Sequence, residues 1–91
     1  MKPEHHSIVS KRVREVLDTV RSEPVARIAT ELAKVVNLEY ARGEAVAAAE
    51  HWKETFLNPE LPANEKDSEL DSCRARHTLW VKVTELKTPK F

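Results

Sequence analysis

The chain has 91 residues, a formal net charge of zero from 15 basic and 15 acidic side chains, and a single cysteine, Cys73. A chain of this length is expected to form one domain, which we take as residues 1–91, and one cysteine excludes an internal disulfide. The balanced charge excludes the large field of one sign on which non-specific nucleic-acid binding depends.

The composition predicts an all-α fold. The chain has one glycine and five prolines, and aromatic residues make up only 5% of it. Abundant Ala, Glu, Lys, Arg and Leu with little glycine favour helices. The charges are unevenly distributed, with a net +2 in residues 1–22, −5 in residues 23–70 and +3 in residues 71–91. The basic ends are therefore able to attract the acidic middle, within one chain or between two.

Residues 1–6 are polar and are expected to form a flexible N-terminal tail. No apolar run long enough for a signal peptide or a membrane span follows them. The single cysteine suits a reducing compartment. We therefore expect a cytoplasmic protein that has no membrane partner.

The first predicted helix covers residues 7–21. Its apolar residues recur at helical spacing and form an amphipathic stripe. The stripe consists of Val9, Val13, Val16, Leu17 and Val20. Ser22 is a candidate N-cap for the next helix, with Pro24 in its first turn. The link is short, which favours antiparallel packing of the two helices.

The second predicted helix, residues 24–57, is the most informative part of the chain. It has no interior proline and a single glycine, Gly43. At ~1.5 Å per residue it would be about 50 Å long, whereas a compact domain of this size is only about 30 Å across. Either the helix bends near Gly43 or the molecule is elongated and completed by a partner chain.

The apolar seam of this long helix changes face near Leu38. One set of residues, Val25, Ile28, Leu32 and Val35, is followed by a second set, Leu38, Ala41, Ala45, Ala48 and Trp52. Two steps of three residues meet where the sets join, which is a stammer-like slip in the repeat. The two halves of the helix are therefore expected to pack on different neighbours.

The third predicted helix covers residues 65–86. The preceding helix ends before Pro59, because proline lacks a donor and disfavours helix in the residue before it. Asn64 is the candidate N-cap, and residues 87–91 are expected to form a C-terminal tail. One side of this helix carries Leu70, Cys73, His77, Trp80, Val81 and Thr84. Residues 78–84 are also compatible with a short strand, but no second strand-like window exists to pair with it.

These elements predict three helices in antiparallel helical hairpins, organised by the long central helix. Every helix would keep an uncovered flank, and a second copy is the simplest cover for those flanks. The predicted architecture is an elongated helical-bundle homodimer.

No catalytic, nucleotide-binding or metal-binding motif is present. Cys73 and His77 are four residues apart, and His51 could approach them from the long helix. A metal site needs three or four converging ligands, and the chain has no CxxC or HExxH pattern. We therefore expect no metal, no cofactor and no enzymatic activity.

By elimination, the sequence favours a non-catalytic small regulatory protein that binds another protein through a helical face, as an inhibitor, anti-activator or adaptor. Tryptophan and other large apolar side chains beside small residues are typical of such contacts. The candidate interface residues are Leu38, Tyr40, Ala45, Trp52, Phe56 and Trp80. The same residues also suit a homodimer interface.

The alternative is a dimeric nucleic-acid-binding regulator that uses a basic first helix. That helix carries Lys11, Arg12, Arg14 and Arg21. Glu15 and Asp18 lie in the same helix, however, and no helix-turn-helix signature is present. We expect nucleic acid to be the less suitable partner.

Overall fold

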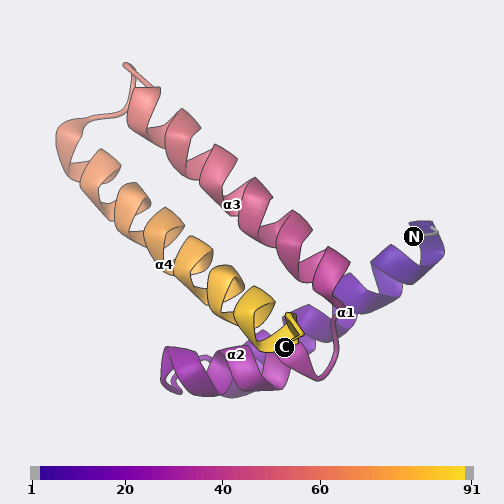
Figure 1. Cartoon of the computed structure of the whole chain (residues 1–91). Helices are drawn as coiled ribbons and strands as arrows, with labels where there is room; N and C mark the ends of the chain where they lie inside the picture. The colour runs from indigo at the N-terminus through magenta and orange to yellow at the C-terminus, as the bar shows by residue number, and fades with distance from the viewer. Residues whose placement is uncertain (1–2, 90–91) are drawn as a thin grey trace.

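The computed structural model describes residues 3–89 and contains four α-helices (Figure 1). They are α1 (Pro3–Val20), α2 (Val25–Ala33), α3 (Leu38–Leu57) and α4 (Ala63–Lys87). Residues 3–89 contain no strand, and residues 78–84 lie inside α4. The all-α class is confirmed, and the predicted count of three helices is wrong.

The predicted long helix, residues 24–57, is two helices, α2 and α3. The amides of Lys34 and Val35 donate to carbonyls three residues back, at 3.3 and 3.0 Å, which tightens the last turn of α2. Asn37 is extended, with φ −97° and ψ 174°, and its Oδ1 accepts a 2.7 Å hydrogen bond from the Tyr40 amide. Asn37 is therefore the N-cap at which a new helix begins.

Of the two alternatives for the long helix, the bend near Gly43 is wrong, because Gly43 lies inside α3 with helical neighbours on both sides. It is exposed, and a Cβ built on it would meet nothing within 4 Å. The chain instead breaks at residues 34–37, where the apolar seam slips. The molecule measures 40 × 30 × 30 Å, which is shorter than an unbroken second helix would be.

The predicted start of the first helix at residue 7 is wrong. Helix α1 begins at Pro3, so residues 3–6 are helical rather than a flexible tail. Proline suits the first turn of a helix, because its missing N–H would have no partner there. Residues 1–2 lie outside the described part of the chain.

The predicted caps of the other two helices are also corrected. Pro24, not Ser22, is the N-cap of α2, and Pro62, not Asn64, is the N-cap of α4; neither makes a side-chain cap. The Pro62 carbonyl accepts the first helical bond, from Lys66 N at 2.8 Å. The C-terminal tail was predicted to begin at residue 87, but Lys87 is the last residue of α4. Residues 90–91 lie outside the described chain.

Helices α3 and α4 form an antiparallel hairpin whose free end is the loop at residues 58–62 (Figure 1). Helix α2 packs on α4 at the other end of the hairpin, where α3 begins and α4 ends. Helix α1 packs against α2. One end of the hairpin is thus covered by two helices, and the rest projects beyond them.

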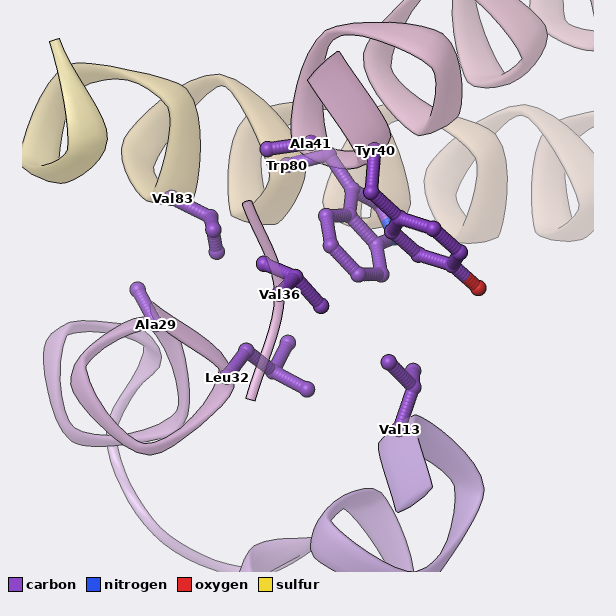
Figure 2. Close-up of a cluster of buried hydrophobic side chains, with 8 residues drawn as sticks. All are labelled: Val13, Ala29, Leu32, Val36, Tyr40, Ala41, Trp80 and Val83. Atoms are coloured by element: carbon purple, nitrogen blue, oxygen red, sulfur yellow. The ribbon is translucent and has the colours of Figure 1, made fainter. Parts of the chain in front are cut away.

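The hydrophobic core lies at this covered end and takes residues from every helix (Figure 2). Leu32 and Val83 are fully buried, and the rings of Tyr40 and Trp80 lie 5.9 Å apart. The cluster consists of Val13, Ala29, Leu32, Val36, Tyr40, Ala41, Trp80 and Val83. The predicted stripe of the first helix packs into it or against it, apart from Val20, which is buried elsewhere.

Two polar contacts tie the helices together around this core. The Ser10 and Tyr40 hydroxyl oxygens lie 3.0 Å apart and join α1 to α3. Lys87 Nζ donates to the Ala33 carbonyl at 3.1 Å. That carbonyl is at the last residue of α2, where a cation is favourable because it satisfies a free acceptor and opposes the helix dipole.

We predict that Asn37→Ala lowers the free energy of unfolding by about 1 kcal/mol, because it removes the only side-chain bond at the start of α3. In a domain of this size that corresponds to a fall of roughly 4–8 °C in melting temperature. Asn64→Ala is the matched control and is expected to leave the melting temperature unchanged. Equal effects from the two substitutions would contradict the placement of the caps.

Candidate protein-binding face

From the core toward the hairpin loop, α3 and α4 pack on each other through small residues. Ala41, Ala48 and Thr55 are spaced by seven and are all buried on the side of α3 that faces α4. Thr55 Oγ1 donates to the His51 carbonyl at 2.9 Å and lies 3.8 Å from Cys73 Sγ. The small side chains let the two backbones approach closely. Each helix covers only one side of the other.

The groove is a shallow apolar hollow on one flank of this hairpin. Its volume is about 300 Å³ and its lining is mainly apolar. It is lined by Arg42, Ala45, Val46, Val81, Thr84, Glu85 and Thr88. Val46 is 59% exposed at its edge. This flank of α3 and α4 has no covering element among residues 3–89.

Aromatic side chains continue the same flank toward the hairpin loop. Trp52 and Phe56 follow Ala45 by seven and eleven residues, which places all three on one side of α3. Trp52 is half-buried, and its ring lies 5.8 Å from that of His77. Phe56 is 64% exposed, and Lys66 Nζ lies 6.0 Å from its ring centroid. Apolar side chains therefore continue on this side of α3 from Ala45 to Phe56.

The six predicted interface residues divide into two groups. Ala45 lines the groove, Trp52 and Phe56 extend its flank, and Leu38 is half-buried at the start of α3. Tyr40 and Trp80 are 7% and 3% exposed and belong to the core. These two stabilise the fold and offer little surface to a partner.

The sequence prediction missed Val46 and Val81 as surface residues. Val46 lies outside the apolar seam predicted for the long helix, so the seam assigned it no role. Val81 was assigned to the packed side of its helix and instead lies half-buried at the edge. Neither position is distinguishable from sequence until the width of the α3–α4 contact is known.

Cys73 and His77, the candidate pair of the sequence, contact different residues of α3. Cys73 is 4% exposed beside Thr55, and the His77 ring contacts Trp52. Among the described residues, no three His, Cys, Asp or Glu side chains are grouped so as to hold a metal ion. Cys73 and His77 take part in the packing of α4 on α3.

A larger hollow of about 420 Å³ lies on the opposite flank, near the loop, and its lining is both polar and apolar. Its lining includes His51 and the carboxylates of Glu54, Glu65 and Glu69, all of them exposed. Water solvates these groups, and they need no protein partner to be stable.

The basic residues of α1 are interspersed with acidic ones. Arg21 pairs with Asp18 at 2.7 Å, and Arg12 lines a hollow together with Glu15 and Glu31. The charges on α1 thus form a mixed surface. In the described part of the chain no helix has both the length and the apolar character that a membrane crossing requires.

Comparison with protein-family models, curated proteins and solved structures gives no match.

We predict that the Cys73 thiol of the folded protein reacts slowly with a thiol reagent such as DTNB, because it is buried, and that it reacts fully in denaturant. The control is the double variant C73A/S72C, which moves the thiol to the exposed neighbouring position and is expected to react at once. Equal native rates for the two proteins would show that Cys73 is accessible.

Proposed function

We propose that this protein is a non-catalytic regulator that binds an amphipathic helix of another protein in the groove between α3 and α4. The observation that carries the proposal is the open apolar groove, with Val46 exposed at its edge. A shallow groove between two helices that lie side by side suits a third helix. Aliphatic residues of that helix, at spacings of three and four, would enter the groove.

The rims of the groove constrain the partner's charges. Arg42 lies on the α3 side, and Glu85 lies on the α4 side. Neither makes an ion pair within the described chain. A bound helix with acidic residues toward α3 and basic residues toward α4 would complement both rims. Such rim charges set orientation and association rate more than affinity.

Trp52 and Phe56 extend the contact beyond the groove. A helix that follows the hairpin would pass from Val81 to the aromatic rings near the loop. Large aromatic side chains beside a small-residue surface are characteristic of binding hot spots. The free thiol Cys73 fits a reducing compartment, so we place this interaction in the cytoplasm.

Binding of this kind would regulate by competition. A helix held in the groove is no longer free to pack in its own protein or on another partner. The chain therefore fits an inhibitor, an anti-activator or an adaptor. This mechanism requires no bond-forming chemistry from the chain itself.

The test is a pull-down from a lysate of the source organism with the wild type, Val81→Glu and Leu86→Glu, followed by direct titration of the purified captured protein. Both substitutions replace an apolar residue of α4, but only Val81 lines the groove, and Leu86 is 50% exposed elsewhere on the helix. We expect Val81→Glu to weaken binding by about tenfold or more, because it places a charge in the apolar contact, and Leu86→Glu to have no effect.

Ala45→Glu is the second groove variant and guards against misfolding of Val81→Glu; circular dichroism checks the fold of each. Two results would contradict the proposal. One is equal binding of the partner by the wild type and both folded groove variants. The other is retention of bulk DNA, with a strong dependence on salt, in place of any protein.

A further inference from the structure

The outer stripe is a line of exposed residues on α3, on the helix face opposite the buried Ala41, Ala48 and Thr55. It consists of Glu39, Arg42, Val46, Glu50 and Lys53. Two of its members, Arg42 and Val46, also form the α3 edge of the groove. Their spacings are three, four, four and three residues, so the stripe is symmetric about Val46. These spacings keep all five side chains on one face of a helix, over about 21 Å of its length.

The charges of the stripe have no ion-pair partners within the described chain. The ion pairs in residues 3–89 involve other acidic and basic groups, and each of the four charged residues of the stripe is exposed. Arg42 is three residues from Glu39, a spacing at which ion pairs form within a helix. It nevertheless pairs with no carboxylate of its own helix. The stripe is therefore free to pair with another molecule.

The order of charges makes the stripe complementary to itself. From the N-terminal end the signs are negative, positive, neutral, negative and positive. If a second stripe runs antiparallel with the two Val46 residues opposed, Arg42 faces Glu50 and Glu39 faces Lys53 of the second copy. If it runs parallel in register, every charge faces its own sign. Like charges in contact are unfavourable, so the pattern selects the antiparallel arrangement.

We propose that two copies of this chain associate through the outer stripes of their α3 helices, antiparallel and centred on Val46. Each of the two ion pairs then occurs twice, as two-fold symmetry requires. The apolar centre of the contact is Val46, which is 59% exposed in the single chain. Gly43 and Ala49 flank it, and a Cβ placed on Gly43 would have open space around it. The helices can therefore approach closely enough to bury both valines.

The dimer and the proposed function share two residues. Arg42 and Val46 belong to the stripe and also line the groove, so a second copy of the chain and a bound helix would compete for them. This consequence rests on the proposed function, whereas the association itself does not.

The contact is small, because it involves one face of one helix from each chain. The surface area buried by such a contact is at the low end of the range for specific protein–protein association. The dimer is therefore expected to form at micromolar concentrations and to weaken as salt screens the four ion pairs.

The test uses charge reversal, with mass measured by light scattering and sedimentation over a concentration series at low salt. We expect the wild type to approach twice the chain mass. Arg42→Glu and Glu50→Arg, measured separately, are each expected to weaken association by about tenfold or more, because each places like charges opposite one another. An equimolar mixture of the two variants is expected to form a heterodimer, because every reversed charge then faces its opposite.

Glu54→Arg is the matched control, since Glu54 is exposed on α3 outside the stripe. It is expected to dimerise like the wild type, as is the groove variant Val81→Glu, so a failure of the groove proposal leaves this result intact. The proposal is overturned if the wild type stays monomeric at every concentration. It is also overturned if the mixture of reversed variants does not associate, or if Glu54→Arg weakens the dimer equally.

Discussion

The break between α2 and α3 is the constraint on which the rest of the structure depends. Ala29 and Ala41 belong to one buried cluster. In an unbroken helix, an offset of twelve positions would separate them by about 18 Å along the axis. The extended backbone at Asn37 folds α2 back over the end of the hairpin, and the bond from its side chain to the Tyr40 amide begins the new helix. The break thus converts a long amphipathic rod into a core.

The position of that core determines which surfaces remain open. Helices α1 and α2 cover one end of the hairpin, where Leu32 and Val83 are fully buried. The rest of the hairpin is a two-helix layer, in which each helix covers one side of the other and leaves its flanks in solvent. Val46 and Phe56 remain 59% and 64% exposed for this reason. The groove and the outer stripe are two parts of this uncovered surface.

The apolar pattern of the sequence predicts the class of the fold and the place of its main irregularity. The stripe of the first helix is buried or half-buried, because spacing reports directly which face of a helix meets the core. The slip near Leu38 marks the break for the same reason. Spacing cannot distinguish a slip in a continuous helix from a break. That outcome depends on the cap at Asn37, which lies between the core residues Val36 and Tyr40.

The candidate interface was only partly predictable, because core and interface use the same residue types. Tyr40 and Trp80 resemble binding residues in composition, yet their rings pack in the core in a tilted arrangement, 5.9 Å apart. Ala45, Trp52 and Phe56 lie on the open flank because the α3–α4 contact is narrow. The width of a helix–helix contact depends on how closely the backbones approach, and a single sequence does not report that distance. The exposed position of Val46 follows from the same width.

Central to this account is that α3 carries the fold on one side and an intermolecular contact on the other. The most direct measurement is the methyl NMR spectrum of the valines, recorded from dilute to concentrated protein at low salt. The account predicts that the Val46 methyl signals shift with concentration while those of Val83, which is fully buried, stay fixed. Val46 signals that do not change at any concentration, or Val83 signals that shift in their place, would contradict it.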